Sequence, residues 1–166
     1  MGMTETLDLP TVEWMTRLAD VMSSDLAVFR KLGEIDCRLA VSILDGQEDG
    51  TRLSVQITFE EFAVTEIKEI SEDQLTEMDF IIDTDQETWQ DMVDNIRAGD
   101  GRPDLEHSLN ALSITGIPIR VWSSDLLGKD MFFRFNQSLQ QFFNNCAKAL
   151  IAVSRKDMSD GRDPTR

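Results

Sequence analysis

The sequence contains one histidine, His107, and histidine is the side chain best suited to act as a general base near neutral pH. It stands between Glu106 and Ser108 in a polar stretch. A nucleophile needs a base positioned beside it in space, and adjacency in the sequence does not establish that geometry. We therefore interpret His107 as a surface residue and expect no catalytic residue. If the protein were an enzyme, the candidates would be Asp83, Asp85 and His107.

Metal and phosphate sites are not expected either. One histidine and two distant cysteines, Cys37 and Cys146, cannot supply the four ligands of a tetrahedral zinc site. Segment 45–56 matches a calcium loop at its first, fifth and sixth positions, but Gln56 stands where a bidentate carboxylate is required. The Gly-Asp-Gly segment at 99–101 lacks the lysine of a phosphate-binding loop. We expect no metal and no cofactor, and we interpret both cysteines as buried thiols.

The charge of the chain restricts its partners. The 166 residues carry 16 basic and 31 acidic side chains and a formal net charge of −15. Nucleic acids and anionic membranes are polyanions that would repel this protein over about 8 Å, so we expect neither as a partner. The acidic residues are scattered, which is typical of a solvated surface, and a docking surface for a basic partner is the alternative.

No apolar stretch reaches the roughly 20 residues that a membrane-spanning helix needs, and residues 1–8 are acidic without an apolar run, so we expect neither a membrane segment nor a signal peptide. With two cysteines and no disulfide framework, we expect a cytoplasmic protein.

Segment 1–34 is predicted to be a helical unit ahead of the main domain. Apolar residues recur at helical spacing from Pro10 to Met22, with Asp8 as the expected cap. A second helix is expected from Asp25 to Leu32.

Segments with strand character follow. Residues 35–43 and 52–59 alternate apolar and polar side chains, which predicts two strands that each bury one face. A polar, glycine-rich turn at 45–50 predicts that they form a hairpin. Two further extended segments are expected at 62–70 and 78–83.

The second half alternates helices with one more extended segment. A capping box at 84–87 predicts a helix that ends at Gly99. A short helix at 104–111 precedes an extended segment at 112–122, whose proline indicates an edge or bent strand. The apolar stripe at 129–153 predicts a long C-terminal helix.

Together these elements predict an α+β fold, with a mostly antiparallel sheet of about five strands and helices covering one face. The main domain is expected to span 35–153, and the polar segment 154–166 is expected to be a flexible tail. Eight Met and nine Phe, without any Tyr, could line a cavity for apolar ligands and could equally form the core.

Three of these stretches resemble the sterol carrier protein 2 family, over roughly residues 37–144. They are the hairpin turn rich in Asp and Gly at 44–50, the strand end and aromatic-bearing helix start at 83–89, and the glycine-containing segment at 112–117. The apolar run continues through 117–122, where the family usually has a glycine and small polar residues. The resemblance implies an apolar tunnel between sheet and helices that binds sterols, fatty acyl groups or other lipid-like molecules without chemistry.

We therefore predict a non-catalytic protein that binds a hydrophobic small molecule between its sheet and its helices. The residues expected to line the site are Val55, Ile57, Phe59, Trp89, Met92, Met131, Phe132 and Phe135. The alternative is a small structural or accessory subunit that docks on a larger enzyme complex, or a homo-oligomer. In that case the long aromatic helix or the region of Trp122 would form the interface.

Overall fold

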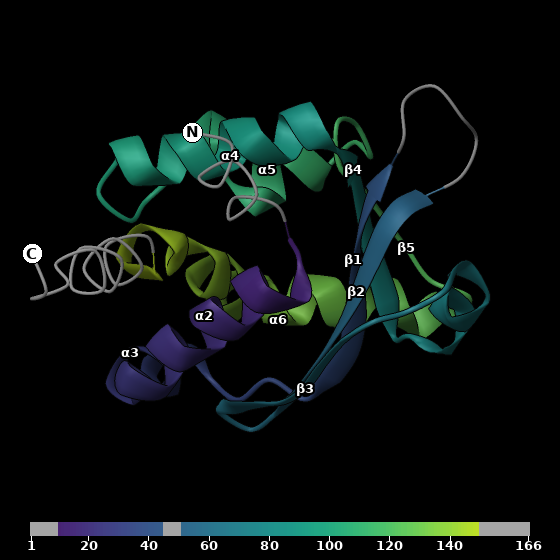
Figure 1. The fold of residues 1–166 in the computed structure, drawn as a ribbon, viewed down its shortest axis with the longest axis horizontal. Helices are drawn as coiled ribbons and strands as arrows, with labels where there is room; N and C mark the ends of the chain where they lie inside the picture. The colour runs from purple at the N-terminus through teal and green to yellow at the C-terminus, as the bar shows by residue number, and fades with distance from the viewer. Residues whose placement is uncertain (1–9, 45–50, 150–166) are drawn as a thin grey trace, which may run out of the picture.

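A computed structural model describes residues 10–44 and 51–149 (Figure 1). Within these ranges the chain forms the strands β1 (Cys37–Leu44), β2 (Thr51–Glu60), β3 (Ala63–Glu69), β4 (Phe80–Asp85) and β5 (Arg120–Trp122). The α-helices are α2 (Val12–Ser24), α3 (Leu26–Leu32), α4 (Gln86–Ala98), α5 (Leu109–Ser113) and α6 (Leu126–Asn144). Two 3-10 helices, η1 (Glu72–Glu77) and η2 (Leu105–His107), complete the described elements.

The strands form one mixed sheet in the order β3-β2-β1-β4-β5. β1, β2 and β3 are an antiparallel meander, and its first two strands form the hairpin that the alternating pattern and the polar turn predicted. The chain then returns from the edge strand β3 through η1, so β4 pairs with β1 in parallel. β5 closes the other edge antiparallel to β4. The predicted α+β class and mostly antiparallel sheet are confirmed.

The two faces of the sheet are covered unequally. Figure 1 shows α2, α3, α4 and α5 on one side of the sheet, and α6 contacts all four of them. Alternate residues of the strands point into this layer and form the main core with Trp14, Leu18, Phe29 and the buried residues of α4 and α6. The opposite face carries a smaller apolar cluster, consisting of Ala40, Ile70, Leu75, Met78 and Ile81.

Two helix starts differ from the sequence prediction. Thr11 caps α2 by accepting a hydrogen bond from the Trp14 amide at 3.2 Å, whereas the predicted cap Asp8 lies outside the described residues. Asp85, one residue after the predicted Thr84, caps α4 by accepting from the Thr88 amide at 2.7 Å. The strand continues through Thr84, whose hydroxyl instead donates to the Pro118 carbonyl at 3.1 Å.

The prediction of an extended segment at 112–122 is wrong for most of these residues. α5 continues to Ser113, Gly116 has a positive φ of 81°, and the Ile119 amide donates to the carbonyl of Leu112 at 3.0 Å. Most of the segment is therefore a helix end and a turn, and the strand is confined to β5 at the sheet edge, as the proline had indicated.

The last helix begins earlier and ends earlier than predicted. Asp125 accepts a hydrogen bond from the Leu127 amide at 3.1 Å and so starts α6. The helix ends at Asn144, one more helical turn covers 146–149, and the rest of the predicted helix lies outside the described residues. Gly128 lets α6 approach β4 closely, because a Cβ there would collide with the Asp79 carbonyl and the Ser123 side chain.

The hairpin turn at 45–50 and the tail at 154–166 also lie outside the described residues. The N-terminal helices contribute to the same core as the sheet, because Trp14, Met15, Leu18 and Met22 on one face of α2 are buried there.

Candidate functional site

The eight residues predicted to line a ligand site lie together in the core between the sheet and the helices. Six of them are fully buried there, namely Val55, Ile57, Phe59, Trp89, Met92 and Phe132. The other two, Met131 and Phe135 on α6, are half-buried and pack against the same core. The strand and helix periodicities therefore place all eight side chains on the faces that meet between the sheet and the helices. That these residues bind a ligand stays a prediction.

Edge-to-face aromatic pairs fill this interior. The ring centroids of Phe59 and Phe142 are 5.2 Å apart, and those of Trp89 and Phe143 are 5.1 Å apart. Phe80 on β4 packs in the same way on Phe132, at 5.7 Å. These pairings stabilise the core beyond the burial of apolar area. The predicted ligand set omitted Phe80, Phe142 and Phe143, although the spacing along α6 already placed Phe142 on its buried stripe.

The core reaches the surface along α6. Met131 and Phe135 lie one turn apart at its border, and the guanidinium of Arg134 stands over the Phe135 ring at 5.9 Å. Phe133 is 49% exposed and touches the buried Phe132 ring edge-to-face, with 5.2 Å between centroids. We define Met131 and Phe135 as the α6 rim, where half-buried apolar side chains border the core.

Two shallow clefts border α2. A cleft of about 240 Å³ separates α2 from β3 and is lined by Thr16, Ala19, Asp20, Ser23 and residues 63–67. A second, of about 200 Å³, is bounded by Arg17, Asp20, Val21, Ser24 and Ala149. Neither contains any of the eight predicted residues.

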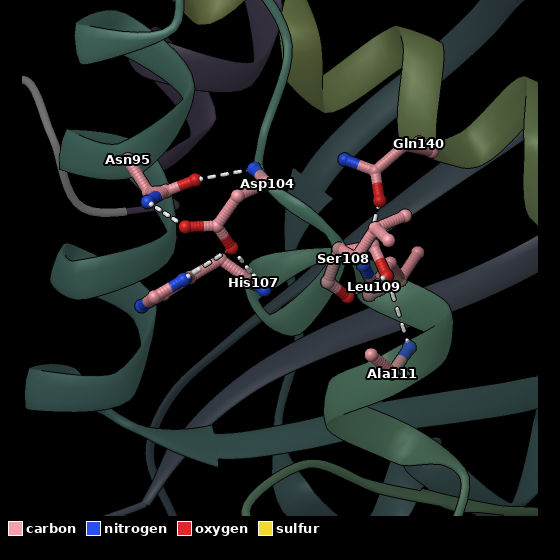
Figure 2. A network of polar contacts seen from close by, with 8 residues as sticks. Asn95, Asp104, His107, Ser108, Leu109, Ala111 and Gln140 are labelled. Carbon is pink, nitrogen blue, oxygen red and sulfur yellow. Dashed lines mark hydrogen bonds and ion pairs between the residues drawn. The ribbon is translucent and has the colours of Figure 1, made fainter.

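A polar network ties α4 to the segment that precedes α5 (Figure 2). The Asn95 side chain on α4 donates to Asp104 Oδ2 at 3.0 Å, and its Oδ1 accepts from the Asp104 amide at 2.8 Å. Asp104 Oδ1 accepts from the His107 amide at 2.9 Å and lies 2.7 Å from His107 Nδ1. These hydrogen bonds, above all that of the His107 side chain and then that of Asn95, lower the pKa of the Asp104 carboxyl.

The same network continues to α6. Ser108 caps α5 by accepting from the Ala111 amide at 3.1 Å, and the neighbouring Leu109 amide donates to Gln140 Oε1 at 2.6 Å. Gln140 in turn donates to Asn144 at 2.9 Å. His107 thus belongs to a structural connection between the helices that cover the core, and its side chain is partly exposed.

The three residues considered for catalysis are not brought together. Asp85 caps α4, His107 binds Asp104, and Asp83 points to the opposite face of the sheet, where it binds Arg120 and Trp122. Within residues 10–44 and 51–149, no group of three His, Cys, Asp or Glu side chains could hold a metal ion.

Both cysteines are buried and unbridged, as predicted. Burial raises the pKa of the Cys37 thiol far above its usual value, and the nearby carboxylates of Asp79 and Asp36 raise it further. Cys37 is therefore a protonated thiol at physiological pH, without the thiolate that nucleophilic chemistry requires.

None of the helices in the described part of the chain is long and apolar enough to cross a membrane.

Comparison with known proteins supports the fold. No model of a known protein family matches the sequence, and no curated protein matches it. Among solved structures, the chain is similar to a crystal structure of sterol carrier protein 2, with a TM-score of 0.57 and 15% identity over 81% of this chain and 94% of the other. It is also similar to a conserved hypothetical protein of Thermus thermophilus, described as a candidate sterol carrier protein. That match has a TM-score of 0.57 and 16% identity over 84% of this chain and 90% of the other. At such identities the matches show a fold like that of sterol carrier protein 2, as the sequence resemblance had implied.

Proposed function

We propose that the protein binds a hydrophobic molecule, such as a sterol, a fatty acyl chain or another lipid-like compound, between the sheet and its helices, and that it performs no chemistry on it. The observation that carries this proposal is the continuous apolar layer that runs from β2 through α4 to the α6 rim. The likeness in fold to a structure named for sterol carrying supports it.

The driving force would be burial of apolar area. A ligand that buries about 300 Å² of apolar surface gains about 7 kcal/mol before the costs of association are subtracted. Because the six residues are fully buried in one core, and Phe59, Trp89 and Phe132 already pack against other aromatic rings, the ligand must displace side chains as it enters. Met92 and Met131 suit this role, since methionine is unbranched and adapts its shape to a neighbour at little cost.

The α6 rim is the proposed route of access. Met131 and Phe135 are half-buried, so they can turn toward solvent without exposing the centre of the core. A ligand that enters there would meet Phe132 first and the Phe80 ring behind it.

The test is a titration with cis-parinaric acid, whose fluorescence rises in apolar surroundings, together with native mass spectrometry of gently purified protein. We expect saturable binding by the wild type and about tenfold weaker binding by Phe135→Gln, because a polar amide replaces an apolar ring at the route of access. Leu105→Gln is the matched control, since Leu105 is 90% exposed on η2 and lies outside the core.

Thermal unfolding of both variants separates lost binding from lost folding. The proposal is wrong if the folded wild type binds neither the probe nor a copurified apolar molecule. It also fails if Phe135→Gln binds the probe as tightly as Leu105→Gln does.

A further inference from the structure

The sheet face opposite the helices carries a buried polar cluster that the hydrophobic-ligand proposal does not use. Asp83 is its centre and is 1% exposed. Its neighbours in register are Ser42 on β1 and Arg120 on β5. Ser42 is in turn paired with Ser54 on β2, and both serines are buried. Polar side chains from four adjacent strands therefore meet on this face, beside the apolar residues Ala40 and Ile81.

The two carboxylate oxygens of Asp83 differ in their hydrogen bonding. Oδ2 accepts from the Arg120 guanidinium at 2.6 Å and from the Trp122 indole at 2.5 Å. Oδ1 is buried, and no described residue donates a hydrogen bond to it. A buried charged oxygen without a hydrogen bond destabilises the folded state. A donor from outside the described residues would remove this cost.

The serine pair offers the complementary group. Ser42 Oγ and Ser54 Oγ lie 2.8 Å apart, and either atom can be the donor. Each hydroxyl carries one hydrogen, and one hydrogen is enough for the bond between them. The hydrogen of the second hydroxyl is therefore available to a ligand. Ser42 lies on the strand next to Asp83, so one ligand group could reach both residues.

The charges select the kind of ligand. Arg120 already neutralises Asp83, so a second cation would be repelled by the guanidinium, and an anion would face the carboxylate. An apolar group would leave Oδ1 and the serine hydrogen unsatisfied. A neutral hydroxyl both donates and accepts, and so satisfies the carboxylate oxygen and the serine pair together.

We propose that Asp83 and the Ser42–Ser54 pair form a second site, on the sheet face away from the helices, that binds the hydroxyl group of a neutral ligand. The ligand hydroxyl donates to Asp83 Oδ1 and accepts from the serine pair. Arg120 provides the access, because its side chain is 60% exposed and stacks over the half-buried Trp122 ring at 5.4 Å. Trp122 is thus engaged with Asp83.

The indole N–H of Trp122 reports directly on this site, because it donates to Asp83. Nuclear magnetic resonance spectra of the full chain would follow the three indole signals during a titration with 2-propanol. Trp14 and Trp89 lie in the core on the other face and serve as internal controls. We expect a saturable shift of the Trp122 signal alone. Acetone, which accepts but cannot donate, should bind about 3- to 10-fold more weakly.

Ser42→Ala removes one hydroxyl and leaves the Asp83–Arg120–Trp122 contacts in place. We expect about 3- to 10-fold weaker binding of 2-propanol, the effect of one neutral hydrogen bond. Ser23→Ala, at an exposed serine on α2, is the matched control and should bind as the wild type does. Ser54→Ala replaces Ser42→Ala if the latter does not fold.

Two results would overturn the proposal. One is a shift that grows linearly and equally at all three indoles, which is a solvent effect. The other is equal affinity of the wild type and the folded Ser42→Ala variant for 2-propanol. That result would mean that an ordered water alone satisfies Asp83 Oδ1. Binding of cis-parinaric acid should be the same in the wild type and Ser42→Ala, so this site can fail or stand independently of the site between sheet and helices.

Discussion

Leu109 and Gln140 are 31 positions apart in the sequence, yet the backbone amide of Leu109 donates to Gln140 Oε1 at 2.6 Å. The Leu109 side chain is fully buried, so this bond fixes the first turn of α5 onto α6 where both helices cover the core.

Replacing Gln140 by Ala should therefore lower stability. The Leu109 amide would lose its acceptor, which costs about 1–3 kcal/mol in a partly buried setting. Urea unfolding followed by circular dichroism measures the change. Gln137→Ala, at an exposed position on the same helix, should change the unfolding free energy by less than 0.5 kcal/mol, roughly the range of surface substitutions. Equal effects of the two substitutions would contradict the role of this bond.

Asp104 should make stability depend on pH in the acid range. Its folded-state pKa lies below the ordinary value of 3.8, so its contribution is fully present above that value and is lost as pH falls toward the lower folded-state pKa. We therefore expect the free energy of unfolding to fall more steeply between pH 6 and pH 2.5 in the wild type than in Asp104→Asn. Asp91→Asn, at an exposed aspartate of α4, is the control and should retain the slope of the wild type.

Phe132 and Phe133 are neighbours in sequence with different roles. Phe132 is fully buried against Phe80, so Phe132→Ala should cost about 3–5 kcal/mol of unfolding free energy. Phe133 is 49% exposed, and Phe133→Ala should cost about 1 kcal/mol or less. Thermal and chemical unfolding of the two variants compare them directly. A larger loss for Phe133→Ala would contradict the orientation of α6.

Cys37 should be inert in the folded protein. Because burial raises its pKa, the thiolate that attacks thiol reagents is not populated at pH 8, and Cys146 is shielded by burial as well. Reaction with Ellman's reagent should reach two thiols only after denaturation. In a Ser23→Cys variant the introduced thiol, at an exposed position, should react at once. Rapid reaction of the folded wild type would refute this.

The sequence predicted the elements where one periodicity dominates. The strict alternation along 35–43 and 52–59 identified β1 and β2 and the residues that face the helices. The spacing of three and four along α4 and α6 identified their buried sides, so the five predicted ligand residues on these helices lie in the core or pack against it. A period of two or 3.6 follows directly from backbone geometry, which explains this success.

The polar side of the sheet could not be predicted in the same way. Ser42 and Ser54 occupy positions that alternation assigns away from the core, which is usually taken to mean solvent. Periodicity says which residues share a face and says nothing of what lies over that face. The burial of Asp83 depends on β5, whose Arg120 and Trp122 side chains reach it from 37 and 39 positions away.

The parallel pairing of β1 with β4 has a consequence for synthesis of the chain. β1 gains its first neighbour from the adjacent hairpin, but its second begins only at Phe80, opposite Leu39. A nascent chain that has not yet released β4 from the ribosome therefore presents a long apolar strand with one unpaired edge. Such edges recruit other strands, so this interval is when the polypeptide most needs protection from aggregation.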